Sequence, residues 1–281
     1  SIACGYMALT YYSMLLSWVT NAFFDSFGKD SIWENEEVTG SDAMKYFEDQ
    51  IIGMESLGSD LRPTRLVWKN AGYSMMTWAI MFLCIAFGIR WTGRITYFTM
   101  GFPIIVLFIM LGRSVSLEGS QEGIQQYLSG DLSVLTNQPE VWMKAVAQIF
   151  FSIGITGVMT AYGSHCHRDE PAFMNSCVIA VSNSLFSFIA GFAVFATLGH
   201  LAVLEDKEIQ DLQVSGFGLV FGSWPVVLGT LPGGDHWIRL LFVMLFLLGI
   251  DSAFSLMESF MICIDDTASF NSINRRYKAL G

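Results

Sequence analysis

Residues 145–166 read AVAQIFFSIGITGVMTAYGSHC, and this stretch decides the fold. It has no Asp, Glu, Lys or Arg, and it is long enough to cross a bilayer as a helix. Ser152, Gly154, Thr156 and Gly157 crowd its centre, where glycine is a poor helix former. Backbone that leaves a helix in hydrocarbon needs partners from protein, water or ions. We therefore predict a helix that breaks there, with freed backbone groups and the Ser152 hydroxyl lining an ion and substrate site.

The same small residues have a second interpretation, which this stretch alone leaves open. Glycine and serine in a membrane helix also allow a neighbouring helix to approach closely, without any break in the backbone.

The composition is that of a membrane protein. Of 281 residues, 53% are hydrophobic and 14% are charged, whereas soluble domains are about 25% charged. A net charge of −10 argues against a nucleic-acid partner, and five widely separated cysteines suggest neither a disulfide framework nor a metal site. The chain starts within an apolar run, without an initiator Met or a basic region, so this start is not a signal peptide. We expect the chain to be a fragment of a longer protein.

Apolar segments predict six membrane spans, and thus an all-α, polytopic membrane protein with a single transmembrane domain over residues 1–281. The predicted spans are residues 1–24, 71–89, 95–112, 141–163, 171–204 and 237–263. The long connections 25–70, 113–140 and 205–236 are acidic, and the first two are expected to hold short helices. The third contains an apolar segment, rich in Gly and Pro, that could fold back without crossing the membrane.

Basic residues in the short connections predict the orientation. Arg90 and Arg94 follow the second span, Arg168 follows the fourth, and Arg275, Arg276 and Lys278 follow the sixth. Alternating spans place all of them on one side, which is then cytoplasmic. The three acidic connections fall outside a cell membrane that the chain crosses several times, with the lipid bilayer as its surroundings.

Asp251 is the most informative single residue. A carboxylate inside LLFVMLFLLGIDSAFSLMESFM, residues 240–261, is costly in a membrane and should face protein, water or a cation. Ser252 follows it and the Leu248 carbonyl lies one turn earlier, so three hard oxygen ligands could share an alkali cation. Glu258 lies two turns further on the same face, where a structural hydrogen bond is favoured over a functional role.

Two polar pairs could hold an anion through neutral donors. Gln148 and Ser152 lie four residues apart in the fourth span, as do Asn183 and Ser187 in the fifth. Hydrogen bonding between helices is the alternative for both pairs. Tyr12, in the first span, could reach a substrate carboxylate, although packing is its default role.

An enzyme is disfavoured, because an intramembrane protease needs two deep catalytic groups and Asp251 is the one deep aspartate. His165 and His167 have no further ligand nearby, so they predict a solvated loop rather than a metal site.

Four motifs together resemble the neurotransmitter:sodium symporter family. Residues 141–164, VWMKAVAQIFFSIGITGVMTAYGS, resemble its sixth spanning helix, which carries a QIFFS-type signature. Residues 93–128, 247–259 (LLGIDSAFSLMES) and 9–18 (LTYYSMLLSW) look like its fifth helix with the following loop, its eighth helix and its third. The resemblance implies a leucine-transporter fold, in which two inverted repeats with broken helices meet at the membrane midplane. It also implies sodium-driven uptake of a small solute by alternating access.

The resemblance assigns roles residue by residue. Ser152 and Asn183 would belong to a first sodium site, and Leu248, Asp251 and Ser252 to a second. The chloride site would comprise Gln148, Ser152, Asn183 and Ser187, and the neutral Ser187 favours chloride dependence. The substrate-binding residues would be Tyr12, Phe151, Ser152, Ile153, Gly154, Gly157, Ser252 and Leu256. Tyr12 would hold a substrate carboxylate, and Phe151 would be the outer aromatic gate.

Three departures accompany the resemblance. An aromatic residue that usually lines the pocket falls on Gly157, the long outer loop has no cysteine pair, and the family's first two helices are absent from the chain. We expect a sodium-coupled, chloride-dependent symporter, with an amino acid favoured as substrate by Tyr12 and Leu256. The alternatives are a symporter for an amine or an osmolyte such as taurine or GABA, and a non-transporting receptor or trafficking protein with this fold.

Overall fold

The computed structural model describes residues 2–28, 32–34, 38–54, 66–86, 89–130, 133–154, 157–212 and 216–266. Within these ranges the regular structure is helical, without strands, as the composition predicts.

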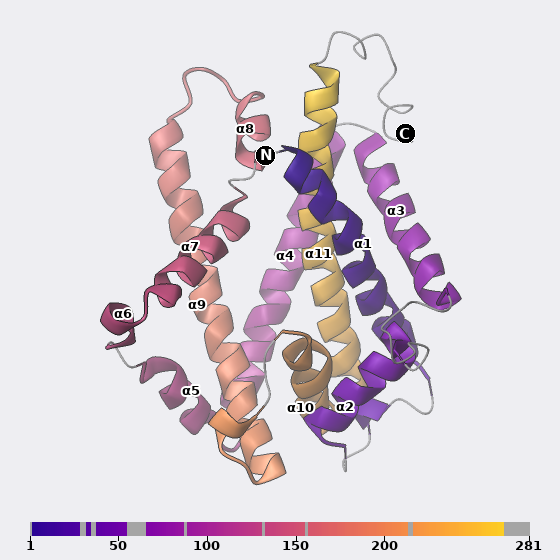
Figure 1. Ribbon diagram of the computed structural model, residues 1–281, viewed down its shortest axis with the longest axis vertical. Helices are drawn as coiled ribbons and strands as arrows, with labels where there is room; N and C mark the ends of the chain where they lie inside the picture. The colour runs from indigo at the N-terminus through magenta and orange to yellow at the C-terminus, as the bar shows by residue number, and fades with distance from the viewer. Residues whose placement is uncertain are drawn as a thin grey trace.

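Long helices occupy the six predicted spans. They are α1 (Ile2–Asp25), α3 (Trp68–Ala86), α4 (Ile89–Val115), α7 (Pro139–Ile153) with α8 (Val158–Gly163), α9 (Ala172–Glu205) and α11 (Gly234–Asp265). Their directions alternate along the vertical of Figure 1, with α1 starting and α11 ending at the top. Most extend a few residues beyond the predicted limits, because helices continue past the apolar core into the membrane surface.

Four helical segments are long and apolar enough to cross a membrane, counting only the described residues. They are Trp91–Val115, Pro139–Gly163, Ala172–Glu205 and Gly234–Asp265. The other two predicted spans, α1 and α3, have 24 and 19 residues, or about 36 and 28 Å at ~1.5 Å per residue. The buried residues of α1 include four polar ones, Ser13, Ser17, Thr20 and Asn21, beside apolar residues such as Leu9. These buried polar residues lower the hydropathy of α1.

Short helices fill the three long connections, at the lower end of Figure 1. The first connection contains the 3-10 turn Ile32–Glu34, α2 (Gly40–Tyr46) and a π-helix (Phe47–Ile52), and the second contains α5 (Ser120–Leu128) and α6 (Val134–Asn137). The third contains the 3-10 turn Ile209–Asp211, the π-helix Gly218–Ser223 and α10 (Trp224–Gly229). The expected short helices are confirmed, and the apolar part of the third connection folds back into the protein without crossing.

A buried aromatic cluster joins the first and third of these connections. Trp33 is 1% exposed and donates from its indole nitrogen to the Phe221 carbonyl at 3.1 Å. Phe47 stacks on Phe221 with ring centroids 3.9 Å apart. Gly229 lies so close that an added Cβ would meet the Trp33 carbonyl at 1.9 Å. The lower ends of the spans are therefore tied together by a packed cap.

Tyr46 ties that cap to the end of α1. Its hydroxyl donates to Asp25 Oδ2 at 2.5 Å. Burial, together with the Asp25 carboxylate, raises the pKa of Tyr46, so the phenol stays protonated and remains a donor at neutral pH.

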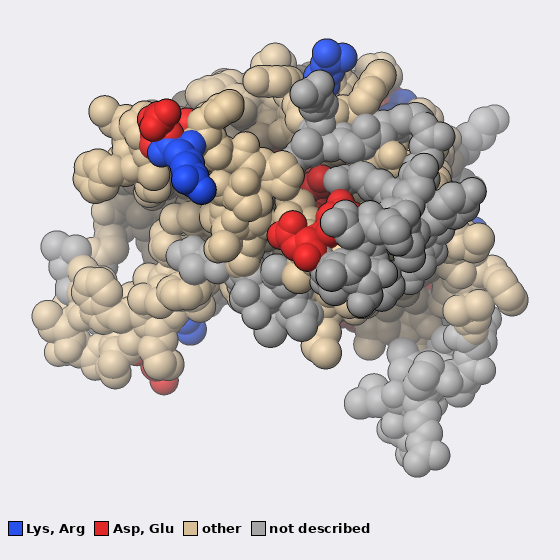
Figure 2. Space-filling view, turned by 90° about the horizontal axis from the view of Figure 1, so that it is seen from above, with Lys and Arg blue, Asp and Glu red and all other residues tan. Residues whose placement is uncertain are grey.

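Figure 2 shows the upper face, where one group of Asp and Glu side chains lies near the centre and Lys and Arg lie toward the edges, one of them against a second acidic group. Arg94, in the first turns of α4, and Arg168, in the connection before α9, both belong to this upper end. The side chain of Arg90 and residues 275–278 lie outside the described part. The common side predicted for the basic residues thus agrees with the helix directions, and its cytoplasmic assignment stays a prediction.

Gly229→Ala should destabilise the protein, because its methyl group would overlap a backbone carbonyl that cannot rotate away. Overpacking of this kind costs about 1–3 kcal/mol. The measurement is the apparent melting temperature of the detergent-solubilised protein. Gly101→Ala in α4, where an added Cβ meets nothing within 4 Å, is the control and should leave that temperature unchanged or higher. Equal melting temperatures for the two variants would contradict this packing.

Candidate functional site

The helix predicted to break does break. α7 ends at Ile153, and Gly154 follows in the left-handed region with φ 71°. α8 starts at Val158 after Gly157, whose φ is 106°. Glycine adopts such conformations at little cost. Ile155 and Thr156 lie outside the described residues, but the glycines on either side establish the interruption.

Gly154 is not at a close contact with a neighbouring span. The nearest atom to an added Cβ would be Cβ of Val158, in the following helix of the same interrupted span, at 3.4 Å. The alternative of close helix approach therefore has no support at this glycine, and backbone conformation explains it.

Ser152 and Asn183 meet across two helices, which fits both the site that the family resemblance implies and the alternative of hydrogen bonding between helices. Asn183 Nδ2 donates to Ser152 Oγ at 3.0 Å, joining α9 to α7. Gln148 and Ser187 each lie one helical turn from this pair, and both are exposed. Because α7 and α9 run in opposite directions, both one-turn steps lead toward the lower end of Figure 1. Among the described residues no hydrogen bond links Gln148 or Ser187 to the pair, so the four-residue anion site stays a prediction.

Leu248, Asp251 and Ser252 lie on one face of α11. Ser252 Oγ donates to the Leu248 carbonyl oxygen at 3.2 Å. Asp251 Oδ1 accepts a hydrogen bond of 2.8 Å from Thr99 Oγ1 of α4. The structure thus brings together the three predicted cation ligands and fixes the orientation of the carboxylate among them.

Tyr12 and Leu256 lie along the contact between α1 and α11. The Tyr12 hydroxyl lies close enough to Ser252 to interact with it, and would be 3.5 Å from a Cβ placed on Gly249. Leu256 Cδ2 would be 3.4 Å from a Cβ on Gly5 of α1. The predicted substrate tyrosine therefore lies beside the predicted cation ligand Ser252.

Phe151 is not placed over this group. Its side chain is 72% exposed, and no ring contact joins it to Tyr12 in the part of the chain that the structure describes. α8 rather than α7 carries the main packing of the interrupted helix against α11. The gate role of Phe151, like the pocket roles of Ile153 and Gly154, stays a prediction.

Two residues near the site escaped the sequence analysis. Thr99 holds Asp251, and the Tyr162 hydroxyl of α8 lies close enough to Ser255 of α11 to interact with it. A signal for Thr99 exists in α4, where Thr92, Thr96 and Thr99 recur at helical spacing on one face. Nothing local marks Tyr162, because its partner lies in a distant helix.

Glu258 is 0% exposed, and its charge lies close enough to Tyr162 to affect that phenol. Burial inside the protein, away from lipid, agrees with the structural role that was favoured for Glu258.

The connection with His165 and His167 is exposed, which confirms a solvated loop. No group of three or more His, Cys, Asp or Glu suited to a metal ion occurs among the described residues.

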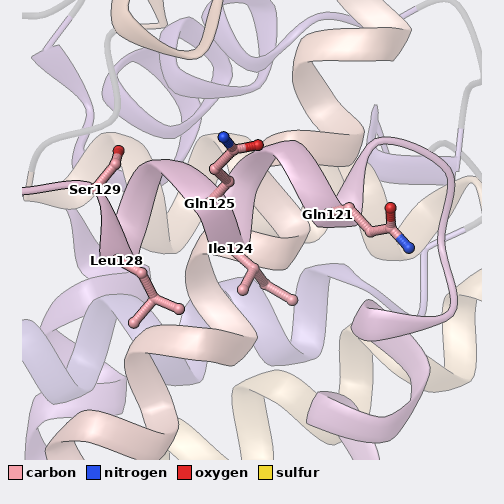
Figure 3. A pocket seen from close by; sticks show the side chains of 5 residues that line it. All are labelled: Gln121, Ile124, Gln125, Leu128 and Ser129. Carbon is pink, nitrogen blue, oxygen red and sulfur yellow. The ribbon is translucent and has the colours of Figure 1, made fainter.

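A surface pocket of about 450 Å³ lies apart from these residues, on α5 at the lower end (Figure 3). Its lining comprises Gln121, Ile124, Gln125, Leu128 and Ser129. The pocket shares no residue with the predicted ion and substrate sites.

Helices of alternating direction, an interrupted span and oxygen-bearing residues within spans define a multi-pass membrane protein of the broken-helix transporter type. The model of the Sodium:neurotransmitter symporter family matches residues 1–280, and the chain belongs to that family. This confirms the family resemblance. It also confirms that the chain comes from a transporter family rather than an enzyme family.

Curated relatives carry the same family relationship. The sodium- and chloride-dependent taurine transporter of Rattus norvegicus is 35% identical over 271 residues, covering 87% of this chain and 43% of the relative. The Homo sapiens neutral and basic amino acid transporter B(0+), also sodium- and chloride-dependent, is 37% identical over 203 residues, covering 72% and 32%. The Rattus norvegicus sodium- and chloride-dependent GABA transporter 2 is 32% identical over 296 residues, covering 95% and 48%. The chain spans less than half the length of these relatives.

A solved structure supports the fold. The crystal structure of MhsT in complex with L-phenylalanine superposes with a TM-score of 0.72 at 20% identity, covering 99% of this chain and 57% of MhsT. At this identity the likeness shows the fold alone, and it confirms the predicted all-α leucine-transporter fold.

Asn183→Ala should loosen the contact between α7 and α9, because it removes the hydrogen bond to Ser152. A net hydrogen-bond contribution of about 0.5–1.5 kcal/mol predicts amide exchange in the last turn of α7 faster by roughly 2- to 10-fold. Hydrogen exchange followed by mass spectrometry measures this. Ser184→Ala is the control, because Ser184 bonds only within α9, to the Ala180 carbonyl at 3.0 Å. Unchanged exchange in α7 would mean that the contact contributes nothing.

Proposed function

We propose that this chain is part of a sodium-coupled, chloride-dependent symporter for a small zwitterionic solute, working in the cell membrane. One observation carries the proposal. Asp251 lies within the span of α11 and shares a face with the Leu248 carbonyl and the Ser252 hydroxyl. A carboxylate is costly in hydrocarbon, and a bound cation offsets that cost.

The geometry of this group suits one sodium ion. Hard cations bind oxygen at about 2.3–2.6 Å, so two ligands at a right angle lie roughly 3.2–3.7 Å apart. The Leu248 and Ser252 oxygens are 3.2 Å apart, and Asp251 supplies the negative charge. These three residues would form this chain's share of the second sodium site.

The contact between α7 and α9 suits the first sodium site and the chloride site. Asn183 turns its amide nitrogen toward Ser152, which leaves its carbonyl oxygen for a cation. Gln148 and Ser187 would complete a neutral ring of donors around an anion one turn away. The names of the taurine, amino acid and GABA transporters, all sodium- and chloride-dependent, support both ions.

The substrate class follows from Tyr12 and from the relatives. Taurine, amino acids and GABA each carry an ammonium group and an acidic group, and a tyrosine hydroxyl can donate to that acidic group. An amino acid fits best, because Leu256 supplies an aliphatic wall. The uncapped groups at the end of α7 would bind the substrate main chain.

Alternating access then follows from differential binding. Sodium at the two sites would favour the state in which the interrupted helix, α9 and α11 surround the substrate, because only that state completes both ligand sets. Phe151 would close over Tyr12 from the outside. Opening of the binding site toward the cytoplasm would then release the substrate and the ions. Connections 25–70, 113–140 and 205–236 would face the outside.

Asp251→Asn should abolish sodium-dependent uptake while leaving surface expression intact, because the amide keeps the shape but loses the charge. The assay is uptake of radiolabelled amino acids, taurine and GABA by cells that express the whole protein, in sodium or choline buffer. Asp266→Asn, at the exposed end of the same helix, should transport like the wild type. Sodium-dependent uptake that survives Asp251→Asn would refute the second sodium site. A wild type that takes up none of these solutes in sodium buffer would favour the non-transporting receptor or trafficking protein.

Ser187→Glu should relieve the chloride requirement, because a fixed carboxylate would replace the anion. Uptake in chloride and in gluconate buffer measures this. Ser187→Gln is the neutral match and should keep the requirement. Wild-type uptake that is indifferent to chloride would remove the four-residue anion assignment.

A further inference from the structure

Thr99 reaches the proposed cation site from a helix that contributes none of its ligands. Its side chain lies on α4 and Thr99 is 4% exposed. Three oxygens surround its hydroxyl, namely Asp251 Oδ1 at 2.8 Å and the Ile95 and Thr96 carbonyls at 3.4 Å. A hydroxyl has one proton, and hydroxyl hydrogen bonds are typically about 2.5–3.0 Å long. The proton therefore goes to Asp251.

This bond determines where the carboxylate points. Hydrogen bonds to an ionised acceptor are stronger than neutral ones and have a narrower geometry. Asp251 is only partly buried, so packing alone leaves its side chain some freedom. Tyr162 of α8 also lies within electrostatic range of Asp251 and offers a competing hydroxyl. A donor from α4 holds one carboxylate oxygen, and the second stays available to a cation.

We infer that Thr99 is a positioning residue for Asp251, and that its hydroxyl sets the sodium affinity of the second cation site without touching the ion. The inference rests on the proposed function, since it assigns a further residue to the same site. Donation by Thr99 withdraws some charge from the carboxylate, which opposes sodium binding. Orientation outweighs this effect, because a rotated carboxylate would lose the ion altogether, whereas a hydrogen-bonded carboxylate keeps most of its charge.

The experiment compares Thr99→Val with Thr99→Ser in the whole protein. Valine keeps the shape and lacks the donor, and serine keeps the donor. Thr96→Val is the matched control, because Thr96 lies on the same helix and donates only to the Thr92 carbonyl at 3.1 Å. Two readouts are needed. The first is the sodium dependence of uptake at saturating substrate. The second is the sodium concentration that gives half of the maximal increase in melting temperature of the detergent-solubilised protein. Choline chloride replaces sodium chloride, so that chloride stays constant.

Thr99→Val should raise the half-saturating sodium concentration roughly 10- to 150-fold in both readouts, as expected for loss of a hydrogen bond to a charged group. Maximal uptake at saturating sodium and the half-saturating chloride concentration should stay close to wild type. The half-saturating sodium concentrations of Thr99→Ser and Thr96→Val should stay within about twofold of wild type. This is less than the change expected from the loss of one hydrogen bond to a charged group.

A wild-type sodium response in Thr99→Val would overturn the inference. So would a variant with lower melting temperature and lower maximal uptake at every sodium concentration but an unchanged half-saturating value, because Thr99 would then only join α4 to α11. A wild type that shows no sodium response in either readout would instead refute the proposed symport, so the two failures are distinguishable.

Discussion

Backbone N–H and C=O groups inside a membrane must be hydrogen-bonded. The interruption between α7 and α8 is a place in this protein where helix geometry does not supply those partners. The Gly154 N–H still donates to the Phe150 and Phe151 carbonyls, and a new helix starts at Val158, so the backbone groups between the two helices need other partners. Gly154 and Gly157 allow the chain to turn in this way, since both have positive φ angles. Two polar contacts between spans, Asn183 with Ser152 and Thr99 with Asp251, lie in helices that surround or adjoin this interruption.

A break of this kind requires rigid surroundings, and the lower cap supplies part of them. Trp33, Phe47 and Phe221 join the first and third long connections, and Trp33 also contacts Phe242 of α11. Arg239 extends the cap to the beginning of α11, where its guanidinium donates to the Ser26 carbonyl and lies 4.4 Å above the Phe27 ring centroid. Since α1 and α11 are fixed at this end, Tyr12 and Ser252 keep their mutual position further along the same two helices.

The sequence alone predicted the features that depend on local composition. Spans, the glycine-marked interruption and the isolated carboxylate Asp251 follow from hydropathy and residue type within one segment. Thr99 and Tyr162 could not be found in this way, because their partners are fixed by tertiary packing. Thr99 and Asp251 are 152 positions apart, and no periodicity in either helix encodes that pairing. The lower hydropathy of α1 has the same origin, since Ser13, Ser17, Thr20 and Asn21 are buried against protein. The family resemblance placed Ser152 and Asn183 in one site, because spacing alone does not identify the partner of either residue.

Gly157 departs from the family pattern, and its backbone conformation gives that departure a different explanation from pocket size. Where relatives are expected to carry a pocket aromatic, a glycine suggests at first a larger pocket. Gly157 is buried and has φ 106°, which non-glycine residues adopt at a cost of order 1–3 kcal/mol. Because this position starts α8 in a conformation that favours glycine, the residue is explained by backbone geometry. Its lack of a side chain is therefore poor evidence about substrate size, and substrate preference is better sought in Tyr12, Ser252 and Leu256.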